Sequence, residues 1–244
     1  MLACWIALSL LSGSGPAGGG PGGDPERWRF ELVPYLWFAS LDGTLELEPL
    51  PAARIDASLA EPLVNLDFAL AEAFAARKGP WVVLADFTFT KLGVDETVSA
   101  SDVEIDSVLL WASLAGGYAV VDAPRARVEL FAGARYLLLD NDGRSVGSID
   151  ASNSKSEDWL DPIVGFDARA ELGGRWSAGL LADVGGFGVG SDLSYELLPR
   201  ISYAWNEILT LNVGYRLLAM DFESSQLDYD VREAGWILGV GFGF

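Results

Sequence analysis

Histidine is absent from this chain of 244 residues, and cysteine and methionine are nearly so, with one and two residues. Enzymes that use histidine as a general base, often beside serine or aspartate, cannot operate here as they are usually built. A zinc site is disfavoured because zinc is held mainly by cysteine and histidine. Chemistry based on carboxylates alone stays open, but no spacing singles out a pair. We therefore expect a protein that is not an enzyme and has no cofactor or metal site.

Positive charge is also scarce, since 16 Lys and Arg residues stand against 35 Asp and Glu residues, for a net charge of −19 at pH 7. No nucleic-acid partner is expected, because affinity for nucleic acid depends on neutralising phosphates with basic side chains. Two interpretations of the acidity remain open. One is a soluble, self-repelling surface, and the other is acidic loops that bind anionic lipid through divalent cations.

No hydrophobic run is long enough for a membrane-spanning helix, which needs about 20 apolar residues. The uncharged stretch 107–121 is shorter than that, and a glycine pair near its end disfavours helix, so we expect a long strand there. Residues 1–23 contain a still shorter apolar core followed by small residues, which predicts a signal peptide that is removed, although no Lys or Arg precedes the core. The only cysteine, Cys4, lies in this segment, so the mature barrel domain, 24–244, would have no disulfide.

What the sequence does contain is alternation of apolar and polar residues with a period of two, the pattern of β-strands with two different faces. A mean hydropathy of +0.26 together with 21% charged residues suits such strands. The clearest alternating segments are residues 28–41, 128–139, 162–172, 176–184, 193–205 and 209–217. Glu72 fits poorly, because it falls on the apolar face of its strand, and around residues 108–114 both faces are apolar.

The connections between these segments alternate in length. Tight turns are indicated at 78–80, 122–124, 173–174 and 206, with longer polar stretches at 95–102, 140–158 and 221–232. Short turns on one rim and long loops on the other are typical of bacterial outer-membrane barrels. Residues 42–65 would form an outer excursion, with its own hairpin and a short helix. The sequence thus predicts an all-β, antiparallel, up-and-down transmembrane barrel of about ten strands, with eight to twelve left open.

Period two alone does not say which face is inside, and a soluble barrel would turn its apolar face inward. The composition of the faces favours the membrane. The polar face carries small residues with isolated charges of both signs, which suits a narrow lumen. The apolar face carries aromatics near strand ends, such as Trp28, Trp176 and Trp205, as expected for interfacial girdles.

The last strand indicates how such a barrel would be assembled. Apolar residues occupy every second position up to the terminal aromatic, namely Trp236, Leu238, Val240, Phe242 and Phe244. This pattern resembles the terminal strand by which outer-membrane barrels are recognised, so we expect the barrel-assembly machinery to be a partner during biogenesis.

The polar face also defines a candidate site, an interior network of charges. Its predicted members are Arg29, Glu31, Asp86, Glu129, Arg135, Asp167, Arg169, Glu171, Asp183, Glu196, Arg200 and Arg216. One interpretation is a set of ion pairs that fills and rigidifies a closed interior. The other is a narrow polar pore in which these residues set ion preference.

Several short segments carry sequence motifs in addition to the alternation of apolar and polar residues. They are Pro34-Tyr35-Leu36-Trp37, Leu41-Asp42-Gly43-Thr44, residues 65–70 with 76–79, residues 183–192, Gly214-Tyr215-Arg216 and the closing Gly-Val-Gly-Phe. In these the chain resembles a family of uncharacterised proteobacterial outer-membrane barrel proteins, over most of its mature length. The resemblance implies structural motifs and supplies no established catalytic or binding residues.

Together these patterns predict an integral barrel of the bacterial outer membrane, in contact with membrane lipid, with a structural role or a role in small-solute permeability. Its oligomeric state stays open. The alternative is a soluble secreted β-barrel that binds an apolar ligand.

Overall fold

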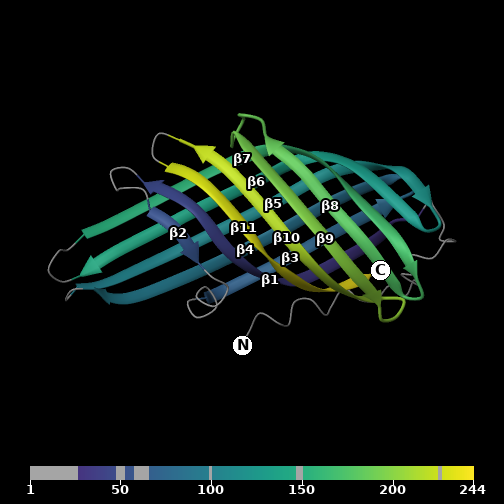
Figure 1. Cartoon of the computed structure of the whole chain (residues 1–244), viewed down its shortest axis with the longest axis horizontal. Coiled ribbons are helices and arrows are strands. Elements are labelled where there is room, and N and C mark those ends of the chain that lie inside the picture. The colour runs from purple at the N-terminus through teal and green to yellow at the C-terminus, as the bar shows by residue number, and fades with distance from the viewer. Residues whose placement is uncertain (1–26, 48–52, 58–65, 99–100, 147–150, 225–226) are drawn as a thin grey trace.

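The computed structural model describes residues 27–47, 53–57, 66–98, 101–146, 151–224 and 227–244. The expected signal peptide lies outside them. All elements of this described part are β-strands (Figure 1). They are β1 (Arg29–Leu47), β2 (Ala53–Ala57), β3 (Leu66–Lys78), β4 (Trp81–Val98), β5 (Ser101–Ala123), β6 (Ala126–Val146), β7 (Ala151–Gly173), β8 (Trp176–Gly186), β9 (Leu193–Ala204), β10 (Leu209–Glu223) and β11 (Leu227–Gly243). Within these ranges no helix is long and apolar enough to cross a membrane.

The strands form one closed antiparallel barrel. Each long strand pairs with its neighbours along the chain, and β11 returns to β1 along the register Glu31↔Gly243 to Leu47↔Leu227. The short β2 forms a hairpin with β1 and adds to its edge, so the wall has ten strands. Within the predicted excursion 42–65, β1 itself continues to Leu47 and is one strand of this hairpin. The predicted fold class is confirmed. The short helix expected in the same excursion would fall on residues outside the described ranges.

One rim of the barrel holds the tight turns and both ends of the chain's β-structure. Gly79 and Gly174 have φ of 53° and 61°, which only glycine adopts readily, so they permit the turns after β3 and β7. At the same rim the Phe30 amide donates to the Phe244 carbonyl at 2.8 Å, next to the start of β1. We call this the turn rim.

The opposite rim differs from the prediction, because the polar stretches expected to be loops are largely paired strand. The ladder between β6 and β7 continues from Asp140↔Ser156 to Ser145↔Ala151, and β5 and β7 each have 23 residues. A tilted membrane-spanning strand needs about 9–11 residues. The alternation fades in these extensions, but a hairpin ladder needs only backbone groups and so forms without it.

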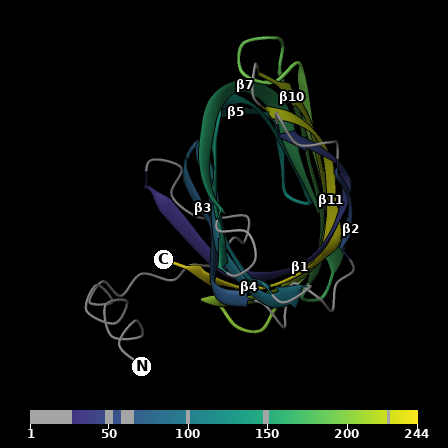
Figure 2. The same cartoon turned by 90° about the vertical axis from the view of Figure 1, so that its left-hand side faces the viewer.

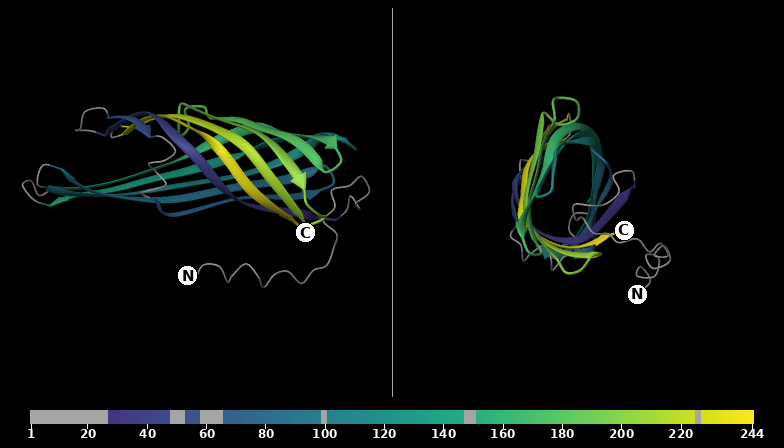
Figure 3. Two further views of the ribbon diagram at one scale, coloured as in Figure 1. Left: turned by 60° about the horizontal axis from the view of Figure 1, so that its bottom comes forward. Right: turned by 90° about the vertical axis from the view of Figure 1, so that its right-hand side faces the viewer.

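These extensions divide into two sheets. One continues β4, β5, β6 and β7, and the other joins β2, β1, β11 and β10. The strands between the two sheets are shorter. On one side β3 has 13 residues, and on the other side β8 and β9 have 11 and 12 residues. The long teal strands reach farthest in Figures 1 and 3, and the end view in Figure 2 shows a flattened barrel. Flattening brings the two sheets face to face.

The outer surface of the barrel wall is apolar. Large apolar side chains are exposed around the whole wall, including Leu114, Leu130, Val164, Ile201, Val213 and Leu238. Aromatic pairs ring the turn rim, with ring centroids 5.1 Å apart for Trp81–Tyr118 and 4.8 Å for Trp176–Tyr203. A second level holds Tyr215–Trp236 at 5.4 Å. From Phe244 to Trp236 a tilted strand rises roughly 20 Å, close to the height of a transmembrane apolar band.

Candidate functional site: the barrel interior

The interior is organised in levels along the barrel axis. Nearest the turn rim is a group of ion pairs, which we call the turn-side layer: Glu31, Arg77, Arg127, Glu129, Asp167 and Arg200. Arg77 lies at its centre, with its Nε 2.9 Å from Glu129 and a second guanidinium nitrogen 3.4 Å from Glu31. Arg200 binds Asp167 through one nitrogen at 2.6 Å and 2.8 Å, and the inward Gly179 leaves the space in which its guanidinium lies.

A second and more deeply buried group crosses the middle of the barrel. This central layer comprises Tyr35, Asp86, Arg135, Asp183, Glu196 and Arg216. Arg216, only 2% exposed, lies 3.0 Å from Asp86 and 2.8 Å from Glu196, and donates to the Tyr35 hydroxyl at 2.8 Å. These side-chain contacts tie β10 to β1 and β4, with which it has no backbone ladder among the described residues, and add to its ladder with β9.

Arg135 is the other cation of the central layer and is fully buried. One of its terminal nitrogens lies 2.8 Å from both Asp183 and Glu196. Arg135 and Arg216 both lie over the Trp111 ring, at 4.9 Å and 4.2 Å from its centroid. Buried charges are tolerated only when they are paired in this way, so the layer is specific in geometry even if its net stabilisation is small.

Some hydrogen-bonding capacity in the central layer is unused. The second terminal nitrogen of Arg135, one carboxylate oxygen of Asp183 and the nearby Ser194 hydroxyl are buried without a hydrogen-bond partner among the described residues. A buried polar group without a partner costs about 1–3 kcal/mol. Arg135 and Asp183 both line a cavity, but these unpartnered atoms are themselves buried.

The cavity lies between the two charged layers and has a volume of about 180 Å³. Most of its wall is apolar, with Val33, Leu84, Phe131, Ile163, Leu181 and Leu198 among the lining residues. Three inward alanines, Ala73, Ala75 and Ala115, leave the space that larger side chains would fill. The interior therefore holds an apolar chamber between polar layers.

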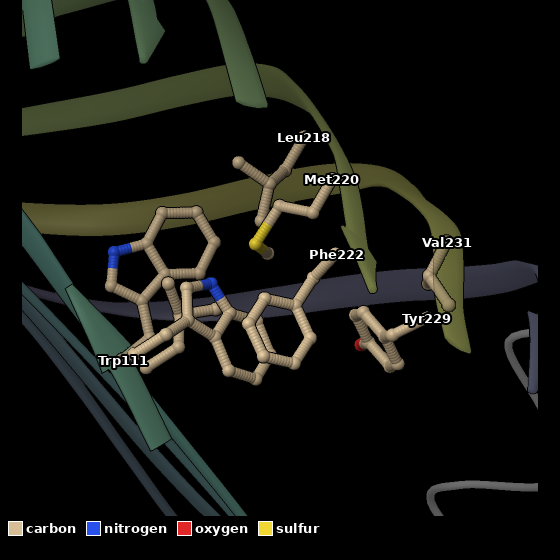
Figure 4. Close-up of a cluster of buried hydrophobic side chains, with 8 residues drawn as sticks. Trp111, Leu218, Met220, Phe222, Tyr229 and Val231 are labelled. Carbon is tan, nitrogen blue, oxygen red and sulfur yellow. The ribbon is translucent and has the colours of Figure 1, made fainter. Parts of the chain in front are cut away.

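Beyond the central layer an outer cluster of apolar side chains packs inside the barrel (Figure 4). It consists of Trp111, Leu137, Trp159, Leu218, Met220, Phe222, Tyr229 and Val231. The first three come from β5–β7 and the others from β10 and β11, so the cluster is the packed core between the two extended sheets. Trp159 stacks on Phe222 with ring centroids 4.0 Å apart. The cluster also explains why both faces are apolar around residue 111, where Trp111 points inward and Leu114 outward.

The structure places nine of the predicted network residues in these two layers: Glu31, Asp86, Glu129, Arg135, Asp167, Asp183, Glu196, Arg200 and Arg216. The other three, Arg29, Arg169 and Glu171, are exposed near the turn rim, where Arg169 and Glu171 pair with each other at 3.4 Å. Alternation assigns a residue to a face, but it does not say how deep the residue lies.

Several interior residues were not among the predicted ones. Arg77 and Arg127 lie beside turns. The alternation would have placed both on the inner face if it had been extended from Ala73 and Ala75 to Arg77, and from Glu129 back to Arg127. Tyr35 and Trp111 carry no formal charge, so a search for charges passes over them. Among the described residues, no group of three or more histidine, cysteine or acidic side chains is arranged to hold a metal ion.

The terminal residues with the expected assembly pattern share the outer face of β11. Trp236, Leu238, Phe242 and Phe244 are exposed, and Val240 is half-buried. Because β11 pairs with both β10 and β1, this strand closes the barrel. Its role in recognition stays a prediction.

No protein-family model matches the chain, and no curated protein matches it in sequence. Solved structures with a similar fold exist. The outer-membrane protease OmpT from Escherichia coli superposes with a TM-score of 0.50 at 9% identity, over 90% of this chain and 97% of OmpT. Two others score lower: Ail of Yersinia pestis has a TM-score of 0.37 at 14% identity, covering 90% and 99% of the two chains. OprG from Pseudomonas aeruginosa has 0.34 at 14%, covering 89% and 94%. The likeness to OmpT shows a shared barrel fold and extends no further.

Proposed function

We propose that this chain is an integral barrel of the bacterial outer membrane that takes a small, mainly apolar molecule into its interior, in a permeability role without catalysis. The observation that carries the proposal is the apolar cavity of about 180 Å³ between two layers of ion pairs. An apolar cavity of about 150 Å³ in another protein stays dry and binds benzene, so a guest with a single ring fits the size and chemistry of this one.

The membrane location rests on the distribution of side chains over the wall. Exposed apolar residues such as Leu114, Ile201 and Val213 surround the barrel, and charged residues lie in its interior. A soluble barrel that carries an apolar ligand would present the opposite arrangement. Outer-membrane lipid, and the assembly machinery during biogenesis, are the partners that follow from the proposal.

An open ion pore is not the function that the interior supports. The central layer and the outer cluster together contain side chains that are almost fully buried, among them Trp111, Arg135, Leu137 and Leu218. We expect no stepwise ion conductance in planar bilayers. A steady conductance of the unmodified protein would contradict the closed interior.

The proposed function is tested by binding of fluorobenzene to the purified barrel in bilayer nanodiscs, followed by ¹⁹F NMR. A saturable, shifted resonance of protein-bound fluorobenzene is expected beside that of fluorobenzene in lipid. Ala115→Leu adds three carbons at the cavity wall and should remove the bound resonance, because the added volume fills the binding space.

Ala112→Leu is the matched control for this test. Residue 112 lies on the same strand but on the opposite, outward face, so the bound resonance should persist. If the unmodified protein shows no saturable resonance, or if Ala115→Leu keeps it, the interior is a packed scaffold. The barrel would then have the structural role that its ion-pair layers would also support.

A further inference from the structure

The inner face of the last strand carries few side chains. The outward residues of β11 form the expected assembly pattern, while the inward positions that follow Ile237 are Gly239, Gly241 and Gly243. The φ angles of Gly239 and Gly241 are not positive, so the backbone there is open to any type of residue. Backbone conformation does not require these two glycines, and the space that they leave needs its own explanation.

A side chain at these two positions would meet different neighbours. At Gly239 a methyl carbon would lie 3.0 Å from a methyl carbon of Val33. At Gly241 it would lie 3.3 Å from Nδ2 of Asn212 and 3.4 Å from Oε1 of Glu31. Gly239 thus allows β1 and β11 to pack closely, whereas Gly241 leaves a small space beside the polar ends of two side chains. We call this space the Gly241 notch.

Asn212, on the neighbouring strand β10, supplies a hydrogen-bond donor at the notch. Its Oδ1 accepts from the Ser202 hydroxyl at 2.7 Å, and its Nδ2 lies 3.5 Å from the Thr210 carbonyl oxygen, which can only accept. The two contacts together fix which end of the amide is the nitrogen. That nitrogen has two hydrogens, and the long contact with Thr210 is its one hydrogen bond among the described residues. The amide of this half-buried residue can therefore donate to a guest.

Glu31, on β1, supplies an acceptor at the same notch. Its Oε2 lies 3.4 Å from Arg77, and its Oε1 is the oxygen next to Gly241. A hydroxyl group in the notch would accept a hydrogen bond from Asn212 and donate one to Glu31. Both demands of a buried hydroxyl would then be met, which removes the cost of taking it out of water.

The notch borders the cavity, because Glu31, Asn212 and Gly239 all belong to the cavity lining. The lining also contains four arginines, each of which is bound by carboxylates: Arg77, Arg135, Arg200 and Arg216. The uncharged amide of Asn212 is not tied to a carboxylate in this way. A ring in the apolar part of the cavity would thus have one polar position beside it, at the side of the turn-side layer to which Glu31 belongs.

We infer that the cavity selects single-ring molecules that carry one hydroxyl group, of the phenol type, and that Asn212 determines this specificity. The ring lies against the apolar wall, and the hydroxyl occupies the Gly241 notch between Asn212 and Glu31. A carboxylate in place of the hydroxyl would be repelled by Glu31. The inference rests on the proposed function, since it needs a cavity that binds a ring.

Two probes of nearly the same shape test the selection. In 4-fluorophenol a hydroxyl lies opposite the fluorine, and in 4-fluorotoluene a methyl group takes its place. ¹⁹F NMR in bilayer nanodiscs gives the Kd of each probe, and the ratio of the two Kd values is the measured quantity. The partition of each probe into lipid is the same for every variant, so it cancels when the ratios of two variants are compared.

Two variants change the notch in different ways. Asn212→Leu with Ser202→Ala removes the amide together with its hydroxyl partner and keeps the shape of residue 212. Gly241→Ala fills the notch with a methyl group, next to side-chain ends that can shift slightly to admit it. Each change should shift the Kd ratio toward 4-fluorotoluene by about fivefold or more, the effect of one lost hydrogen bond.

Gly116→Ala is the matched control. Residue 116 lies on the outward face of β5, and a methyl group there would have nothing within 4 Å, so the Kd ratio should stay as in the unmodified protein. Binding of 4-fluorotoluene shows that the cavity of a variant is intact. A variant that lost the cavity would bind neither probe, and the other variant then decides.

The outcomes separate the two proposals. An unchanged ratio in Asn212→Leu with Ser202→Ala would overturn the role of the amide, and an unchanged ratio in Gly241→Ala would overturn the position of the hydroxyl. An equal shift in Gly116→Ala would also overturn the inference, because the effect would then be unspecific. If the unmodified protein binds neither probe saturably, the proposed function itself is contradicted.

Discussion

Arg216 contacts three of the five other members of the central layer. Its guanidinium contacts Asp86, Glu196 and Tyr35 and lies over the rings of Trp37 and Trp111, at 5.0 Å and 4.2 Å from their centroids. Arg216→Met removes the charge but keeps much of the volume, and leaves buried carboxylates without their cation. We expect the free energy of unfolding to fall by about 3–5 kcal/mol. Urea titration of the barrel in phospholipid vesicles measures the change.

Two further substitutions separate the role of this site from a general effect of charge. Arg216→Lys keeps the charge but lacks the planar guanidinium that binds several partners and lies over the tryptophan rings, so an intermediate loss is expected. Arg169→Met removes an arginine whose side chain is 46% exposed, and should change stability by less than about 1 kcal/mol. Similar losses for Arg216→Met and Arg169→Met would mean that the central layer has no special role.

At the scale of the strand, the outer face of β10 offers a test of the membrane environment. Val213 is 45% exposed and pairs with Leu238 and Ile201, which are exposed as well. Val213→Arg should lower the free energy of unfolding in vesicles by about 2–4 kcal/mol, because it places a charge in the apolar band. The same exchange at Val189, which is 72% exposed in the turn between β8 and β9, should have little effect. A soluble barrel would tolerate both substitutions equally.

The strands also show how far the sequence could predict the fold. Alternation assigned the faces of β6 to β10 because each has one outward apolar face and one interior face. It failed beyond residue 140, where the β6–β7 backbone ladder continues through a polar stretch that has no alternation. It was ambiguous at Trp111 because an inward aromatic and an outward leucine are both apolar. Apolar residues on two faces of one strand signal a packed interior in such a barrel.

At the scale of the whole molecule, the candidate site depends on contacts between segments far apart in the chain. Trp159 meets Phe222 only because the two extended sheets face each other, and Tyr35 meets Asp86 only because β3 presents alanines between them. The sequence contains the charges but not their depth, and it contains the aromatic residues but not their partners across the lumen. Those features follow from strand stagger and closure, which no local pattern specifies.

Phe244 contacts Phe30 where the barrel closes, and it is also the expected assembly signal. Its backbone exchanges hydrogen bonds with Phe30 at 2.8 Å and 3.0 Å, and its ring lies 5.7 Å from the ring of Phe30. Phe244→Ala keeps the backbone bonds and removes the ring, so the assembled barrel should lose only about 1 kcal/mol of stability, the value of one aromatic contact at an exposed site. Unaided refolding into detergent, measured by the heat-dependent mobility of the barrel on gels, should then proceed almost as for the unmodified chain.

In cells the expected outcome of Phe244→Ala is different. If the terminal aromatic is the assembly signal, the fraction of the chain found as folded barrel in the outer membrane should fall severalfold, while Phe244→Trp keeps it near normal. Phe242→Ala is the matched comparison, since that residue shares the outer face but is not terminal. Parallel losses in cells and in detergent would show that the ring serves closure alone, because a signal read by an assembly machinery has no effect where that machinery is missing.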